Sequence, residues 1–183
     1  MCTVFISGSR NIKSLNIKIE QRLINILSQN FLVVIGDANG VDKAVQKFLA
    51  EKEYNTVEIY CSGNNCRNNL GNWNLKQIDS NATGRKFYEA KDKIMAKIAD
   101  YGFVIWDGNS IGSLNNIAEL LSQNKKSLVY YLPKKDFITI ASNEHLKSLV
   151  KDRESNLLNK IQKKGSTYLK KFTDFQQELS LSL

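Results

Sequence analysis

Three short polar segments of the chain contain glycine, and each directly follows an apolar run typical of a buried strand. They are residues 7–10 (Ser-Gly-Ser-Arg), 36–42 (Gly-Asp-Ala-Asn-Gly-Val-Asp) and 107–113 (Asp-Gly-Asn-Ser-Ile-Gly-Ser). Glycine lets the backbone approach a ligand closely, and successive N–H groups in a turn or at a helix start bind anions. The segments therefore predict a site for a phosphate or a similar anionic group.

The elements that must position these segments alternate between strand and helix patterns. Such alternation is typical of an α/β fold with a parallel sheet and crossover helices. We expect strands at 3–7, 31–35, 56–60, 102–106 and 127–132, a short edge strand at 137–140, and helices at 17–28, 41–49, 86–100 and 113–123. The carboxyl ends of parallel strands meet at one edge of an open sheet, so the three segments are expected to converge there.

Glycines after strands also form tight turns without any ligand, and for a single segment that explanation is as good as a binding site. Convergence of three segments favours the binding site. The sequence excludes two common phosphate-binding motifs, because it has neither Gly-x-Gly-x-x-Gly at the first helix nor Gly-Lys-Ser/Thr.

The composition is that of a globular protein, with 183 residues of which 42% are hydrophobic and 24% charged. The chain has no apolar run of the roughly 18 to 20 residues that a membrane span needs and no signal-peptide pattern, so we expect a cytoplasmic protein without a membrane partner. A net charge of +8 favours anionic partners. With one histidine, His145, and three cysteines, Cys2, Cys61 and Cys66, we expect no metal site, no disulfide framework and no cofactor.

Residues 62–84 depart from the alternating pattern. They are rich in Gly, Ser and Asn, and their length predicts a long loop or lid. Trp73 is difficult to explain as a core residue in this polar stretch, which favours a role in covering a ligand. Trp106, in a predicted strand, is expected in the core. Arg67 and Arg85 flank the loop and are expected either to be solvated or to reach a phosphate.

Residues 143–183 predict a helical extension to the domain formed by residues 1–142. Apolar residues recur there at helical spacing: Leu146, Leu149, Val150, Leu157, Leu158, Ile161, Leu169, Phe172 and Phe175. Such faces are too extensive to leave in water, so they must cover the sheet domain or a second copy of the chain. Because the domain has helices enough for both sheet faces, we expect a homodimer or higher homo-oligomer with the extension near its interface.

The order of the motifs resembles the SLOG superfamily of Rossmann-like nucleotide-binding domains, named for the DNA-processing protein Smf/DprA and the Lonely Guy phosphoribohydrolases. The matching motifs are Gly-Ser-Arg at 8–10, Gly-x-Ala-x-Gly-x-Asp at 36–42, Lys-Asp-x-x-Met at 91–95 and Trp-Asp-Gly-x-Ser-x-Gly-Ser at 106–113. The chain departs from the family pattern at Asp37, Val41 and Ser113. The resemblance spans residues 3–132 and is greatest to a branch of small bacterial proteins. It implies an open parallel sheet of order 3-2-1-4-5 with helices on both faces.

The resemblance also implies where a nucleotide binds. Gly112 and Ser113 would hold a phosphate, and the turn that carries Gly40 and Asp42 would face the ribose or the base. The complete set of expected ligand-binding residues is Gly8, Ser9, Arg10, Gly36, Gly40, Asp42, Lys91, Asp107, Gly108, Ser110, Gly112 and Ser113.

Catalysis is a separate question. In the phosphoribohydrolases a glutamate follows the glycine-rich segment and an arginine precedes the helix methionine; this chain has Asn116 and Lys91 at those positions. An amide cannot act as a general base. The remaining carboxylate candidates, all weak, are Glu89, Asp92 and Glu119.

The sequence therefore favours a binding module or sensor for a nucleotide or a nucleotide-derived small molecule. An N-glycosidic-bond hydrolase of nucleosides or nucleotides is the alternative, disfavoured by Asn116. A third hypothesis is single-stranded DNA binding, which the net charge supports and the lack of a dense basic stripe with interleaved aromatic residues opposes.

Overall fold

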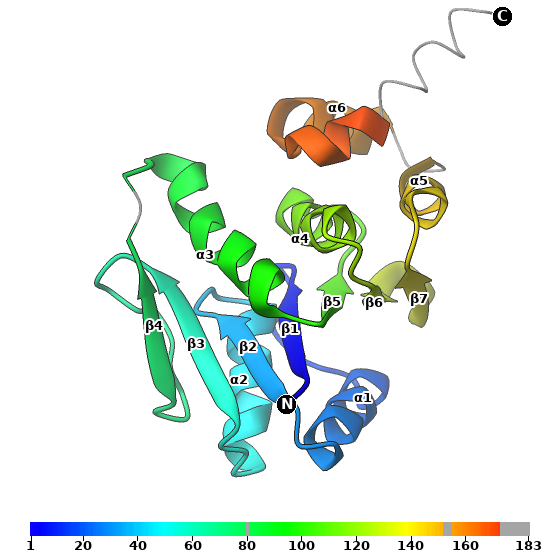
Figure 1. The fold of residues 1–183 in the computed structure, drawn as a ribbon. Coiled ribbons are helices and arrows are strands. Elements are labelled where there is room, and N and C mark those ends of the chain that lie inside the picture. Colours follow the sequence, from blue (N-terminus) through cyan, green and yellow to red (C-terminus); the bar gives the residue numbers. More distant parts are fainter. Residues whose placement is uncertain (80, 152–154, 173–183) are drawn as a thin grey trace, which may run out of the picture.

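The computed structural model describes residues 1–79, 81–151 and 155–172, and its core is a seven-stranded sheet (Figure 1). The strands are β1 (Thr3–Gly8), β2 (Leu32–Gly36), β3 (Val57–Ser62), β4 (Asn74–Ile78), β5 (Tyr101–Trp106), β6 (Ser127–Tyr131) and β7 (Asp136–Ile140). The helices are α1 (Ile17–Ser28), α2 (Val41–Glu51), α3 (Gly84–Ile98), α4 (Ile111–Ser122), α5 (Asn143–Lys151) and α6 (Ser155–Lys164).

The strand order is β4-β3-β2-β1-β5-β6-β7, with every neighbouring pair parallel except the antiparallel edge strand β7. The predicted α/β class, the open parallel sheet and the edge strand are confirmed. The five central strands also have the expected order. The chain leaves β1 toward β2 on one side, and it adds β5 on the other side after α3. This reversal is the topological switch point at which open α/β sheets bind ligands.

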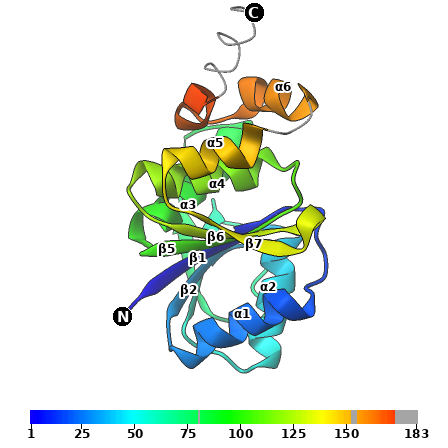
Figure 2. The same cartoon turned by 90° about the vertical axis from the view of Figure 1, so that its right-hand side faces the viewer.

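Helices cover both faces of the sheet (Figure 2). Alternate residues of β1 point to opposite faces, so Val4 and Ile6 pack with α1 and α2 while Phe5 packs with α3. The second face also receives α4, which crosses β5 and lies beside α3. The loops after β1 and β5 therefore meet between α3 and α4.

The expectation of a long loop over residues 62–84 was wrong, because the segment contains β4, paired in parallel with β3. Its residues Asn74, Lys76 and Gln77 are polar because β4 is a half-exposed edge strand. Trp73 does not cover a ligand: its ring is buried in the core and its Nε1 donates to the Tyr54 carbonyl at 2.8 Å.

Trp106 lies in the core, as expected, with no exposed surface. Its ring packs against Tyr131 in the cluster formed by α4, β6 and the C-terminal helices.

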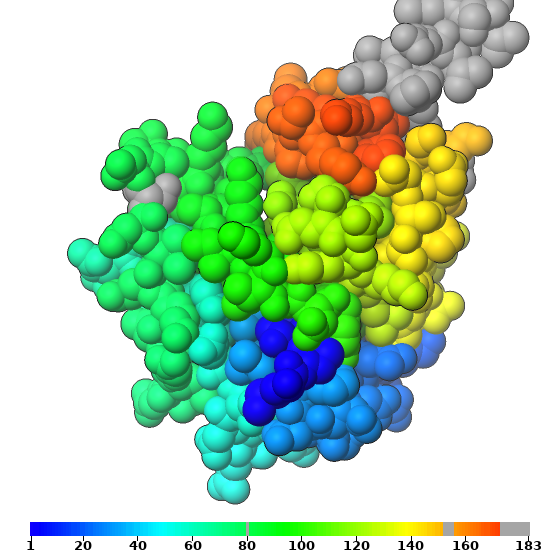
Figure 3. Space-filling model, viewed as in Figure 1, coloured from blue at the N-terminus to red at the C-terminus, as the bar shows by residue number. Residues whose placement is uncertain are grey.

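The extension packs on α4 within the same chain (Figure 3). Its buried residues join those of α4 in one cluster: Leu146, Leu149, Val150, Leu157, Ile161, Leu169 and Phe172. Of the two alternatives for these faces, the domain of the same chain covers them, because α4 is buried nearly all round and one sheet face cannot cover it. The homo-oligomer stays a prediction. Phe175 lies outside the described residues. Among the described helices, none has the length and apolarity that crossing a membrane demands.

Candidate functional site

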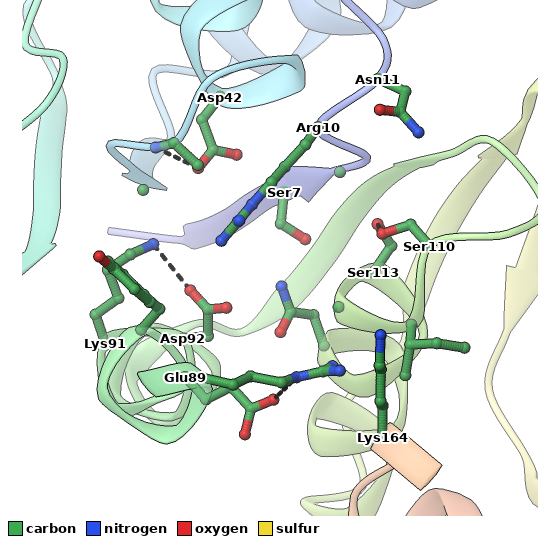
Figure 4. A pocket seen from close by; sticks show the side chains of 18 of the residues that line it. Ser7, Arg10, Asn11, Asp42, Glu89, Lys91, Asp92, Ser110, Ser113 and Lys164 are labelled. Carbon is green, nitrogen blue, oxygen red and sulfur yellow. Dashed lines mark hydrogen bonds and ion pairs between the residues drawn. The ribbon is translucent and has the colours of Figure 1, made fainter. Parts of the chain in front are cut away.

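A cavity of about 640 Å³ opens at the carboxyl ends of β1, β2 and β5, between α3 and α4 (Figure 4). Its wall combines the loop after β1, the start of α2, the N-terminal part of α3, the start of α4 and the end of α6. The predicted crevice at the switch point is thus a real cavity, and its size is typical of a small-molecule site.

The start of α4 forms one wall of the cavity. Ser110 is its N-cap residue but makes no side-chain capping hydrogen bond, and Gly112 and Ser113 of the first turn line the cavity. Asp107 shapes the preceding turn, because its Oδ1 accepts hydrogen bonds from the N–H groups of Asn109 (2.9 Å) and Ser110 (2.8 Å). The helix therefore presents its positive end to the cavity without a side chain closing it.

The loop after β1 contributes a hydroxyl and a guanidinium. Ser7 is only 5% exposed, and its Oγ has no hydrogen-bond partner among the described residues. Figure 4 shows this hydroxyl between Arg10 and Ser113. The Arg10 guanidinium forms no ion pair within the described part of the chain and lies 6.0 Å from the centre of the Tyr88 ring. Buried hydroxyls normally have partners, and Ser7 shares this lack with Ser62 and Ser127, but of the three it alone lines the cavity, beside Arg10.

A buried charge cluster forms the opposite wall. Lys91 is 3% exposed, and its Nζ lies 3.0 Å from Asp92 Oδ1 and 3.8 Å from Asp37 Oδ1. Burial alone would lower the pKa of Lys91, but Asp92, Asp42 and Asp37 outweigh it and raise that pKa above its ordinary value. Lys91 is therefore a fixed cation.

Asp42 differs from its neighbours in the cluster. Burial raises its pKa to about 6, although the positive charge of Lys91 opposes the shift. Its Oδ2 accepts a hydrogen bond from the Ala38 N–H at 3.1 Å. Gly36 leaves room for both groups, since a Cβ there would collide with Lys91 Nζ and Asp42 Oδ2.

Asp37 is a buried carboxylate with two cationic neighbours. It is 2% exposed, and Arg67 binds it in bidentate fashion: Nε lies 2.9 Å from Oδ2 and Nη2 lies 2.7 Å from Oδ1. Burial favours the neutral acid, but Arg67 and Lys91 hold the pKa of Asp37 below its usual value. The two cations thus keep the buried carboxyl of Asp37 ionised.

The structure brings together nine of the twelve predicted ligand-binding residues on the cavity wall: Gly8, Arg10, Gly36, Asp42, Lys91, Asp107, Ser110, Gly112 and Ser113.

The other three predicted binding residues, Ser9, Gly40 and Gly108, have structural positions behind the wall. Ser9 is fully buried, and its Oγ lies 3.3 Å from Ser113 Oγ and accepts from the Asp107 N–H at 3.1 Å. Gly40, with φ +89°, packs against the backbone of Arg10. Gly108, with φ +85°, forms the turn before α4.

The three candidate carboxylates are separated. Glu89 and Asp92 line the cavity, and they form ion pairs with Arg85 and Lys91. Glu119 does not line it, and its Oε1 accepts from Gln123 Nε2 at 3.0 Å. Asn116 occupies the cavity wall instead.

Sequence reasoning missed several lining residues. Neither the residue type nor the spacing of Ser7 and Tyr88 distinguishes them from ordinary strand and helix residues. Lys160 and Lys164 lie four residues apart on α6, and their spacing predicts one helical face but not where that face packs. Arg67 and Arg85 line the cavity, and each is paired with a carboxylate.

No protein-family model, curated protein or solved structure matches the chain, so the site is interpreted from its own geometry.

Proposed function

We propose that the chain binds a nucleotide or a nucleotide-derived small molecule, as a sensor or binding module of the SLOG type. One observation carries the proposal: the partnerless Ser7 hydroxyl, the unpaired Arg10 and the uncapped start of α4 all face one cavity at the switch point of the sheet. Each of these groups lacks a partner that an anion would supply.

A phosphate fits this place on chemical grounds. The free N–H groups of the first turn of α4 donate hydrogen bonds, and the helix dipole favours negative charge there. Arg10 adds a planar donor with a permanent charge, and Ser7 and Ser113 add hydroxyl donors. Gly112 leaves the approach open, because the nearest atom to a Cβ built there is Ser110 Oγ, 3.9 Å away.

The remainder of the cavity suits the sugar and the base. Asp42 and Asp92 are acceptors for ribose hydroxyl groups, and Tyr88, a residue that is 40% exposed, offers an aromatic ring. The guanidinium groups of Arg10 and Arg67 lie 6.0 and 5.0 Å from the centre of this ring. A planar base stacked at Tyr88 would thus lie among cations, which attract the electron-rich face of the base.

The geometry gives less support to the two other hypotheses. For a hydrolase, Asn116 lies where the family's glutamate would act, and Glu119 is turned to Gln123. For single-stranded DNA, successive aromatic platforms along a basic groove are needed. Of the residues that line the cavity, Tyr88 has an exposed ring, whereas Phe5 is fully buried.

Native mass spectrometry of the purified protein, followed by a thermal-shift panel of nucleotides, tests the proposal. We expect either a retained nucleotide or a rise in melting temperature with at least one phosphate-bearing member of the panel. The same spectrum tests the expected homo-oligomer. A protein that retains no ligand and is stabilised by no nucleotide would contradict the proposal.

A further inference from the structure

We infer that Lys160 and Lys164 of α6 bind a second anionic group, so that the ligand is a nucleotide with two or more phosphates. This inference rests on the proposed function, and it assigns a binding role to a part of the chain that lies outside the motifs of the Rossmann-like domain. Both lysines line the cavity. They are four residues apart and therefore share one face of α6.

The end of α6 is fixed beside the proposed phosphate site. Asn115, at the start of the second turn of α4, accepts a hydrogen bond from the Ser166 N–H at 2.7 Å and donates one to the Lys164 carbonyl at 3.4 Å. Lys160 Nζ donates to Asn109 Oδ1, in the loop before α4, at 2.7 Å. These contacts hold both lysines at the mouth of the helix start, and Figure 4 shows the Lys164 side chain rising from α6 toward α4.

Charge is distributed unevenly around the cavity. On the α3 side each cation has a carboxylate partner: Lys91 with Asp92, Arg85 with Glu89, and Arg67 with Asp37.

On the α4 side the described residues give no such partner to Arg10, Lys160 or Lys164. The carboxylate on that side is Asp107, whose Oδ1 is already held by the turn. Positive charge is therefore in excess where the phosphates would lie, and the two lysines extend it beyond the place that Arg10 and the start of α4 give to one phosphate.

A simpler explanation for Lys164 is its place in the last turn of α6, where a cation offsets the helix dipole. Lys163 occupies the same turn, is exposed and does not line the cavity. Lys163 therefore offsets the helix dipole as Lys164 does, but it does not reach the cavity where the ligand would lie. This makes Lys163→Ala the matched control.

Calorimetric titration with paired nucleoside mono- and diphosphates of adenine, guanine, cytosine and uracil tests the inference. We expect the wild-type protein to bind at least one diphosphate at least tenfold more tightly than its monophosphate. The double variant Lys160→Ala/Lys164→Ala should lose about tenfold in diphosphate affinity, since hydrogen bonds to charged groups are of this strength, and change monophosphate affinity less than twofold. Lys163→Ala should bind both like the wild type.

Three results would overturn the inference while leaving the proposed function intact. The first is that the wild-type protein binds the mono- and diphosphate of every nucleoside that binds with equal affinity. The others are that the double variant loses as much monophosphate affinity as diphosphate affinity, or that Lys163→Ala loses as much diphosphate affinity as the double variant. Binding of none of the eight nucleotides would contradict the proposed function itself, and the inference with it. Circular dichroism of each variant separates these outcomes from unfolding, since Lys160 and Lys164 are not core residues.

Discussion

Arg67 donates three hydrogen bonds to the buried carboxylate of Asp37, two from its side chain and a third from its backbone N–H at 3.1 Å. The pair joins the loop after β2 to the segment that leads into β4. The positive charge of Lys91 in turn interacts with three carboxyl groups, those of Asp37, Asp42 and Asp92. The Asp37 carboxylate thus holds Arg67 beside the loop after β2 through three hydrogen bonds.

Replacement of Arg67 by alanine should destabilise the fold by about 2 kcal/mol. Removing one partner of a buried ion pair leaves an uncompensated charge, but here Lys91 remains near Asp37 and Arg67 is itself partly exposed. Urea unfolding of Arg67→Ala measures the loss. Arg85→Ala is the control, since its pair with Glu89 is an exposed i,i+4 pair of about 0.5 kcal/mol or less. Equal stability of the two variants would show that the ion pair of Arg67 with Asp37 stabilises the fold no more than the exposed pair of Arg85 with Glu89 does.

The pH dependence of stability should carry the signature of Asp42. Because its pKa is about 6 in the fold against 3.8 ordinarily, the folded state binds the extra proton between these values. The contribution of Asp42 to the free energy of unfolding is greatest below pH 4 and declines as pH rises to about 6. Asp42→Asn should remove this decline, gaining up to about 3 kcal/mol relative to the wild type between pH 4 and pH 7.

Urea unfolding at pH 4, 5, 6 and 7 measures this difference, with Asp136→Asn on the exposed edge strand β7 as the control. The two curves for wild type and Asp42→Asn should separate as pH rises. Parallel curves would mean that Asp42 titrates in the fold as it does in the unfolded chain.

The sequence predicted the sheet and nine residues of the cavity wall, because buried parallel strands are continuous apolar runs and the glycine segments follow them. The central strand order was implied by the family resemblance. The sequence did not predict β4, whose polar residues lie at an edge where no alternation is required. Nor did it predict the ion pair of Asp37 with Arg67, which joins residues 30 apart through tertiary packing. The position of Lys160 and Lys164 depends on α4 being covered by the extension, and local patterns carry no information about that.

Packing of the extension should make a large contribution to stability. Ile161 is fully buried in the cluster that joins α6 to α4, whereas Leu158 is only half-buried at its border. Ile161→Ala should lower the free energy of unfolding by about 2 to 5 kcal/mol, and Leu158→Ala should cost distinctly less. Chemical denaturation measures both. A similar small effect in the two variants would contradict close packing of α6 on the domain.

Release of free base from nucleoside monophosphates should be weak or absent. A general base contributes about 10² to 10⁴-fold, and Asn116 cannot supply it. Chromatographic assay of base release over hours, with and without protein, checks the expectation. Rapid release that Glu89→Gln abolishes while Glu119→Gln retains would instead assign an enzymatic role to the cavity carboxylate.

The most direct test of the central claim is calorimetric titration of Gly112→Val with whichever nucleotide stabilises the wild-type protein. Gly112 does not have a positive φ, so valine brings no left-handed backbone strain, and its side chain extends into open space at the start of α4. The variant should fold normally and lose nucleotide binding by at least a hundredfold, because the branched side chain occupies the place of the phosphate. Ser122→Val, at the exposed other end of α4, should bind like the wild type. Undiminished binding by folded Gly112→Val would contradict the assignment of the phosphate to this helix start.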